Sequence, residues 1–324
     1  MNVSCIETMW TAAAVVLGVA VGAVHAQSFP SKPLRIIVPF PAGGNADLTS
    51  RMLGEHLNKA FGQSVIVDNR PGAGAVIGYE IGAKAPPDGH ALLIVYPSFI
   101  INPSIRRVQY DPFKDFRAVT QLISLPMMVA VHPSLPVNTF KDLVALARKR
   151  PGEISYATPG VGTIQHVVGE LIKQTMKLDL THVPYSGFAI AMPALAGGHV
   201  VSAVGNVFDV SPFLQTGKVR AIVVTSPART ELLPDVPTMR EVGFPEFEAM
   251  NWGGFVVPAA TPTAAVTRLN GELVRILNMP EIQEKFRAQG QTAVPGTPEQ
   301  LASLLQSESV RYSKTIKAAG IRAE

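Results

Sequence analysis

Residues 35–53 read RIIVPFPAGGNADLTSRML, and the order of residue types in this stretch decides the fold. Arg35 to Phe40 is short, rich in Ile and Val and followed by proline, which predicts a buried strand. After two glycines, apolar residues recur at helical spacing, and Gly62 stands where that helix would stop. The stretch therefore predicts a strand, a tight glycine turn and a helix.

This glycine turn has the features of an anion-binding site. The first turn of a helix leaves backbone N–H groups without partners inside the helix. Gly43 and Gly44 let the backbone approach a ligand closely, and Asn45 and Asp47 are both candidate N-caps. For one isolated loop, a plain strand-to-helix turn with glycine for geometry alone is an equally open reading.

A second copy of the same design follows later in the chain. Residues 153–158 (EISYAT) predict a strand, residues 159–162 (PGVG) form a glycine turn, and Thr163 caps a predicted helix that runs to about Lys177. Two such turns suggest two lobes that each offer one turn to a ligand between them. Short apolar runs alternate with helical patterns elsewhere, which predicts an α/β architecture.

The other predicted elements complete this alternation. Predicted strands cover residues 64–68, 91–96, 121–131, 180–183, 200–205, 219–225 and 251–258, and predicted helices cover residues 74–84, 139–150 and 188–195. Two more helices are predicted to start at Thr261, as an N-cap before proline, and at Thr297, with a capping box. Thr139 and Asp142 form the other predicted capping box.

The first 26 residues differ from the rest of the chain. Residues 11–24 are an almost unbroken run of small apolar residues, and Val24-His25-Ala26 matches the cleavage pattern of a secretory signal. This run is too short for a comfortable membrane span. Residues 1–10 are atypical for a signal because they contain no Lys or Arg and include Glu7. We expect export with cleavage after Ala26, and an uncleaved anchor or a misassigned start is the alternative.

Composition limits the possible functions of the mature chain. Cleavage leaves 298 residues, enough for one large domain or two medium ones. The one cysteine, Cys5, leaves with the signal, which excludes disulfides, thiolate metal sites and a cysteine nucleophile. Loss of Glu7 raises the formal charge from +4 to +5, but the basic residues are scattered. We therefore expect no nucleic-acid binding, which normally needs a basic stripe.

Sequence patterns for catalysis are missing. The chain has no Gly-x-Ser-x-Gly stretch, and no histidine pair has metal-ligand spacing. His166 alone lies near a glycine turn, and it also fits a packing or capping role. The turns instead offer backbone N–H groups and the side chains of Asn45, Thr158 and Thr163, which suit reversible carboxylate binding. We predict no catalytic residue, no cofactor and no metal.

Several motifs together resemble a known family. They are PSKP (30–33), VPFPAGG (38–44) with Asp47, NRPGAG (69–74), PDG (87–89), INPS (101–104), YAT (156–158), GVGT (160–163), HVPY (182–185), GKVRA (217–221) and PDVPT (234–238). On these stretches the mature chain resembles the Bug/TctC family, the extracytoplasmic solute-binding receptors of tripartite tricarboxylate transporters.

This resemblance implies an α/β, type II-like Venus-flytrap fold whose chain crosses twice between the lobes, near Pro126 and near Asn251. The first lobe would combine residues 27–126 and 252–324, and the second would hold residues 127–251. The implied protein is a periplasmic, monomeric receptor that captures a small organic acid and delivers it to a membrane permease. A receptor that signals to a membrane kinase and an exported α/β hydrolase are the alternatives.

Family positions also imply a ligand site. The implied residues are Pro41, Ala42, Gly43, Gly44, Asn45 and Asp47 in the first turn, Thr158, Gly160, Val161, Gly162 and Thr163 in the second, and Tyr185 and Asn206 nearby. Tyr185 fits a buried core position nearly as well.

The chain departs from the family at three polar positions. Val76, Ser186 and Ser202 replace the residues that the family often has there, namely Asn, a basic residue and Asp. This puts a dicarboxylate or tricarboxylate ligand in doubt. Aromatic residues occur in the same part of the pattern, and they favour a monocarboxylate or an aromatic acid: Tyr96, Phe99, Phe188 and Phe208.

Overall fold

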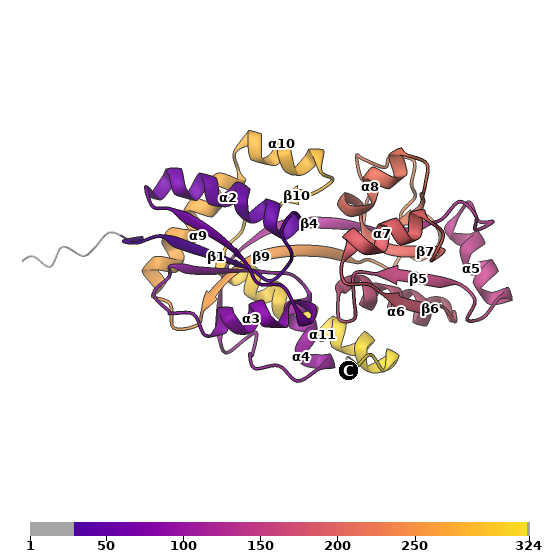
Figure 1. The fold of residues 1–324 in the computed structure, drawn as a ribbon, viewed down its shortest axis with the longest axis horizontal. Coiled ribbons are helices and arrows are strands. Elements are labelled where there is room, and N and C mark those ends of the chain that lie inside the picture. Colours follow the sequence, from indigo (N-terminus) through magenta and orange to yellow (C-terminus); the bar gives the residue numbers. More distant parts are fainter. Residues whose placement is uncertain (1–28, 323–324) are drawn as a thin grey trace, which may run out of the picture.

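A computed structural model describes residues 29–322 and shows an α/β protein with two lobes (Figure 1). The predicted signal segment, residues 1–26, lies outside the described residues. The strands are β1 Leu34–Val38, β2 Val65–Asn69, β3 Ala91–Val95, β4 Phe116–Val131, β5 Ser155–Thr158, β6 Thr181–Pro184, β7 Ser202–Asn206, β8 Arg220–Val224, β9 Met250–Pro258 and β10 Thr292–Ala293.

Helices follow most of the strands. They are α2 Asn45–Phe61, the 3₁₀ turn η2 Ala73–Ala75, α3 Val76–Ala83, α4 Ser98–Ile105, α5 Phe140–Lys149, α6 Ile164–Met176, α7 Phe188–Ala196, α8 Val207–Gln215, α9 Thr263–Leu277, α10 Pro280–Ala288 and α11 Pro298–Ala319. The predicted α/β alternation is therefore confirmed.

The first lobe is built on the strand order β2-β1-β3-β9-β4. Strands β1, β2 and β3 are parallel, whereas β9 is antiparallel to both β3 and β4. Side chains alternate across the sheet: Leu34, Ile36 and Val38 pack with residues of α2, α9 and α10, and Ile37 packs with residues of α3, α4 and α11. Both faces of this sheet are thus buried, which explains the apolar sequence of β1.

The second lobe is built on β4, β7, β5 and β6, with β8 also paired to β4. Strands β7, β5 and β6 are parallel, and β4 runs antiparallel to β7. Tyr156 packs on the side of α5 and α6, and its neighbour Ala157 packs on the side of α7 and α8. The repeated strand, glycine turn and helix thus occur once in each lobe, as predicted.

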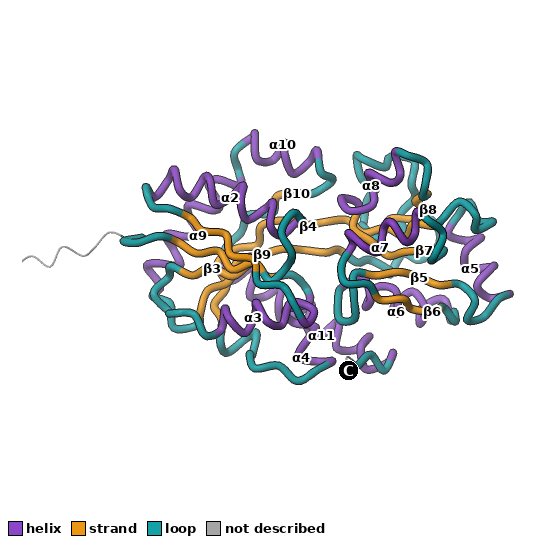
Figure 2. Tube along the Cα trace, in the orientation of Figure 1, coloured by secondary structure: helices purple, strands orange, loops and turns teal. Residues whose placement is uncertain are grey.

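Two strands connect the lobes, and Figure 2 shows them running through the middle of the molecule. The part of β4 from Phe116 to Pro126 pairs with β9, and the part from Met127 to Val131 pairs with β7 and β8. Helix α11 packs against β4, α4 and α6, so it also touches both lobes. Its Thr315 carbonyl accepts a hydrogen bond from Gln174 Nε2 at 3.2 Å.

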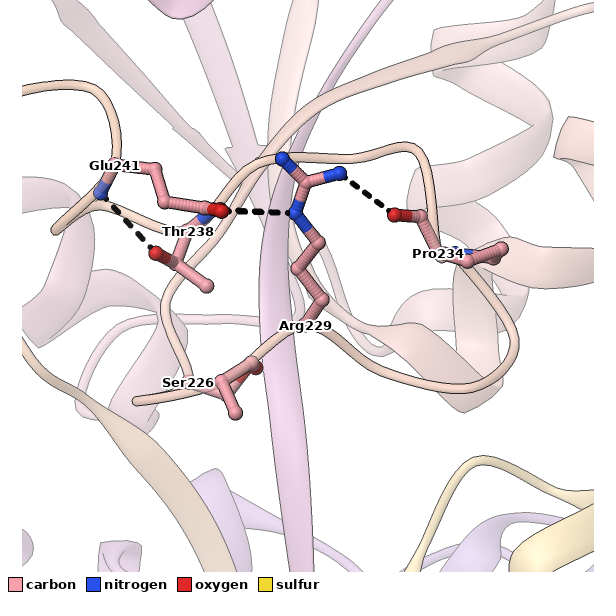
Figure 3. Close-up of polar contacts among 6 residues, drawn as sticks. Ser226, Arg229, Pro234, Thr238 and Glu241 are labelled. Carbon is pink, nitrogen blue, oxygen red and sulfur yellow. Dashed lines mark hydrogen bonds and ion pairs between the residues drawn. The ribbon is translucent and has the colours of Figure 1, made fainter.

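The long segment between β8 and β9 has its own polar support (Figure 3). Arg229 Nε donates to Glu241 Oε2 at 3.0 Å, and Arg229 Nη1 donates to the Pro234 carbonyl at 2.8 Å. The Glu241 amide donates to Thr238 Oγ1 at 3.2 Å. These bonds fix the shape of the connection that precedes the second crossing.

Most helix-end predictions are confirmed. Gly62 ends α2 in the left-handed conformation, and both predicted capping boxes, at Thr139 and Thr297, are present. The predicted N-cap of α9 is wrong, because Pro262 takes that position and Thr261 is buried before it. Helices α4, α8 and α10 and strand β10 were not predicted. Helices α4 and α8 each contain an internal proline, a residue that in a sequence pattern indicates the end of a helix.

Candidate functional site

The two glycine turns lie at corresponding places in the two lobes. Residues 41–44, here called the first turn, follow β1, and residues 159–162, the second turn, follow β5. Each turn therefore lies at the carboxyl end of a parallel strand and at the N-terminus of a helix. In open α/β sheets this edge is where ligands bind.

The first turn is exposed, and the carboxylate of Asp47 in the first turn of α2 supports it. Asp47 is 2% exposed, and its Oδ2 accepts a hydrogen bond from the Gly43 amide at 2.9 Å. Arg51 pairs with the same carboxylate at 2.9 Å. Burial alone would raise the pKa of Asp47, but the bonds from Arg51 and Gly43 outweigh it and hold that pKa below its ordinary value. Asp47 therefore fixes the shape of the turn, and because it accepts the hydrogen bond of the Gly43 amide, that amide does not serve a ligand.

The N-terminus of α2 has no side-chain cap. Gly44 is the N-cap, which corrects the prediction of Asn45 or Asp47. The physical reason is that both side chains have other partners: Asp47 bonds Gly43, and Asn45 Oδ1 accepts from Tyr96 Oη at 2.5 Å. Within residues 29–322, the amides of Asn45, Ala46 and Asp47 have no hydrogen-bond acceptor. Three donors are consequently available at this helix end.

The second turn is better buried and touches the first lobe. Gly162 has φ +83°, and a Cβ there would lie 2.4 Å from Ile105 Cδ1 of α4. The Val161 carbonyl accepts a hydrogen bond from Arg106 Nη2 at 3.3 Å. The predicted cap is confirmed, because Thr163 Oγ1 accepts from the His166 amide. The second turn therefore packs between the lobes.

Two stacked histidines support the second turn from inside the second lobe. The rings of His166 and His182 lie 3.9 Å apart and nearly parallel, and His182 Nε2 bonds Thr158 Oγ1 at 2.7 Å. Burial lowers the pKa of His166 to about 4, and burial followed by the neighbouring His166 lowers that of His182 to about 3. Both rings are therefore neutral at pH 7. The sequence indicated His166 but not this pairing.

A polar network lies where the lobes join. Asn206 Oδ1 accepts from Gln165 Nε2 at 3.1 Å and from Asn251 Nδ2 at 3.0 Å, and Asn206 Nδ2 donates to Asp209 Oδ2 at 2.7 Å. Asn206 pairs with Met127 in the sheet, just beyond the point where β4 changes partners. Asn206 thus lies at the lobe junction, and Asp209, which sequence reasoning missed, lies beside it.

The remaining predicted residues occupy three settings. Pro41 and Ala42 are exposed in the first turn; Gly160 is half-buried, and its amide donates to Thr158 Oγ1 at 3.3 Å. Tyr185 is partly buried, and its amide donates to the Thr158 carbonyl at 3.0 Å. The structure thus gathers Tyr185 with the second turn. Within residues 29–322, the hydrogen bond between the second turn and the first lobe comes from Arg106, the residue after α4, and not from the first turn.

The aromatic residues do not form one group. Phe99 is fully buried in the core of the first lobe, where its ring stacks on Tyr110, so its predicted place near the ligand is wrong. Phe188 packs beneath Gly205 in the second lobe. Tyr96 is the aromatic residue that reaches the first turn, through Asn45 and through an edge contact with Phe40.

Residues 29–322 contain neither a membrane-spanning helix nor a cluster of metal ligands. No helix in this part of the chain is long and apolar enough to cross a membrane. No group of three or more His, Cys, Asp or Glu side chains in it is arranged to hold a metal ion.

Comparison with known proteins gives a consistent result. A family model described as "Tripartite tricarboxylate transporter family receptor" matches residues 49–321. Protein BugT of Bordetella pertussis is 32% identical over 302 residues, which cover 92% of this chain and 93% of BugT.

Solved structures of similar proteins agree in fold. R. palustris Rpa4515, solved with adipate, has a TM-score of 0.85 and 33% identity, and the match covers 91% of this chain and 99% of that one. MatC from Rhodopseudomonas palustris, solved with bound malate, has a TM-score of 0.81 and 28% identity, with 89% and 100% coverage.

Proposed function

Because the chain belongs to the tripartite tricarboxylate transporter receptor family, we propose that it captures a small organic carboxylate between its lobes and presents it to a membrane permease. The family consists of periplasmic solute-binding receptors and not of enzymes. We further propose that this chain is exported by cleavage after Ala26, acts as a monomer and performs no chemistry on its ligand.

One observation carries the proposal: the N-terminus of α2 has no side-chain cap and lies directly after a glycine turn at the carboxyl edge of the parallel strands. Helices α5 and α11 each begin with a capping box that satisfies their first amides. Helix α2 begins at a ligand-binding edge with a glycine N-cap and three amides without acceptors in residues 29–322. Such amides, together with the helix dipole, favour an anion such as a carboxylate.

The second turn supplies the opposing side in this proposal. Residues 160–163 would contact the ligand from the second lobe, and Asn206 and Tyr185 would border it. The lobes would be residues 27–126 with 252–324, and residues 127–251, hinged at β4 and β9. A ligand that contacts both turns would favour the closed arrangement, because it binds that arrangement more tightly than the open one.

Relatives support a carboxylate as the ligand class. Rpa4515 was solved with adipate and MatC with malate, and both have more than a quarter of their residues identical to this chain. Phe99 is buried in the core and does not favour an aromatic acid as the ligand.

A pair of variants tests the role of the α2 amides. Asn45→Pro and Asn45→Ala both lose the side chain that bonds Tyr96, but only proline also removes the amide N–H. Proline fits here because Gly44 is extended, with φ −81° and ψ 172°, and because the first helical position tolerates proline.

The measurement is calorimetry with carboxylates found by mass spectrometry of the purified protein or by a panel of organic acids. We expect Asn45→Pro to bind about ten-fold more weakly than Asn45→Ala, as for loss of one hydrogen bond to a charged group. Equal affinities of the two variants would remove α2 from the site.

A further inference from the structure

Asp209 is a carboxyl group held at the junction of the lobes. It lies in the first turn of α8, directly after β7, and is therefore at the same carboxyl edge as the second turn. Its Oδ2 accepts from Asn206 Nδ2 at 2.7 Å. Gln165 of α6 and Asn251 of β9 fix Asn206 in turn, so three elements determine where the carboxyl group lies.

Asp209 differs from other acids that are buried or partly buried. Asp47 pairs with Arg51, Asp68 pairs with Arg35 and Glu170 pairs with Lys173. Within residues 29–322, Asp209 forms no ion pair, and the side-chain amide of Asn206 is its one hydrogen-bond donor. Burial raises the pKa of the Asp209 carboxyl to about 6, so the group is mostly ionised at neutral pH and lacks a counter-charge.

Contacts link the Asp209 carboxyl group to the first turn. Burial, and after it the charge of Asp209, raises the pKa of Tyr96. Tyr96 bonds Asn45 at the start of α2, and its ring lies against Gly253, two residues beyond Asn251 on β9. A continuous set of contacts therefore joins the open amides of α2 to Asp209.

These two groups have opposite polarity. The α2 amides are donors that favour an anion, whereas Asp209 offers carboxylate oxygens that favour a donor or a cation. A ligand with a carboxylate at one end and an ammonium group at the other would satisfy both groups. A second carboxylate would meet a like charge at Asp209, which costs affinity.

We propose that Asp209 is a specificity residue that pairs with an ammonium group, so that the preferred ligand is an aminocarboxylate and not a dicarboxylate. This inference rests on the proposed function, because it takes the carboxylate end to be held by α2. Ser202, at the opposite end of β7, is buried, and its hydroxyl bonds the Ser155 carbonyl at 2.7 Å, so it offers no polar group to this ligand.

Matched sets of small acids test the proposal by calorimetry. Each set has the same chain length and differs at one end only: ammonium, carboxylate or methyl. One set is β-alanine, succinate and butyrate; another is γ-aminobutyrate, glutarate and valerate; a third is alanine, methylmalonate and isobutyrate. We expect the full mature chain to bind the ammonium member of at least one set about ten-fold more tightly than both partners.

The variant Asp209→Asn keeps the size of the side chain and an oxygen for Asn206, but removes the charge. We expect it to lose the preference for the ammonium member. Asp142→Asn, which changes an exposed capping carboxylate of α5, is the control and should keep the preference.

The outcomes separate this inference from the proposed function. Tighter binding of a dicarboxylate by the unchanged protein, through a proton shared with Asp209, would overturn the inference alone. An ammonium preference that survives in Asp209→Asn would also overturn it. Failure of every acid in the three sets and in the wider panel to bind would overturn the proposed function as well.

Discussion

The two glycine turns share a sequence pattern but are supported in different ways. The first turn is exposed, and a Cβ added at Gly43 would have nothing within 4 Å. The second turn is packed, and a Cβ at Gly162 would lie 2.4 Å from Ile105. The first turn leaves its helix uncapped, whereas the second has Thr163 as a cap. The same pattern therefore provides an open donor site in one lobe and a fitted interlobe contact in the other.

The largest expected difference comes from the matched variants Gly162→Ala and Gly43→Ala. Both positions have positive φ, +83° and +81°, so both variants carry backbone strain of about 1 kcal/mol. Only Gly162→Ala adds overpacking against buried Ile105, for a total loss of about 3 kcal/mol in the free energy of unfolding. Urea denaturation measures both losses. Similar losses would mean that the second turn is not packed as described.

Acid should destabilise the support of the second turn next most strongly. The pKa values of His166 and His182 are lowered in the folded protein, so the unfolded chain binds protons more readily below about pH 6.5. The stability that these two neutral rings contribute is therefore fully present above about pH 6.5, and it is lost as the pH falls toward 4. Glu170 and Lys173 also face this pair, and their effects on the His166 pKa oppose each other.

We expect a loss of about 2 kcal/mol in the free energy of unfolding between pH 7 and pH 5.5. Urea melts across this range measure it. His166→Phe keeps an aromatic ring on His182 and removes one titrating group, so its loss should be about half as large. An unchanged pH dependence in that variant would contradict the assignment. The lowered pKa of Asp47 acts below its ordinary value of 3.8, outside this range, whereas the raised pKa of Asp209, about 6, gives a smaller effect of opposite sign within it.

The variant Asp47→Ala tests whether the first turn is supported independently of the second. It removes the acceptor of the Gly43 amide and the partner of Arg51, which should cost about 1.5 kcal/mol. Because the turn is exposed, its loosening should increase amide hydrogen exchange at Gly43, which loses its acceptor, and leave the amides of residues 160–163 unchanged. Exchange that rises equally in both turns would show that the turns are not supported independently.

The smallest effect concerns the cap of α6. Thr163→Ala and the control Thr139→Ala each remove an N-cap and should each cost about 1 kcal/mol in thermal melts. Only Thr163→Ala should also weaken carboxylate binding, because Thr139 caps α5 in the second lobe away from both turns. Equal binding losses would count against the second turn as a ligand contact.

Local signals made the turns predictable, and distant contacts made other parts unpredictable. Proline after a β-branched run, paired glycines and Gly62 in the left-handed conformation all act within a few residues, so the first turn could be recognised. The capping boxes are local for the same reason. The bond between Asn45 and Tyr96 depends instead on how β1 and β3 pair within the first lobe, and the setting of Asp209 depends on the contact between Asn206 and Asn251.

Asn45 bonds Tyr96, 51 positions away, and therefore does not act as the cap that its sequence position indicates. Asp209 was missed because its significance lies in the network of Asn206 and Asn251, which are 45 positions apart. Phe99 was misplaced because an aromatic residue beside a strand end can turn into the core as readily as toward a ligand.

A crystal structure with the carboxylate that copurifies, or with the tightest binder of the acid panel, would show whether the α2 amides hold the ligand. We expect a carboxylate oxygen within about 3 Å of the amide nitrogen of Asn45 or Ala46, with residues 160–163 contacting the same molecule. A ligand bound elsewhere, with the first turn of α2 facing only solvent, would contradict it.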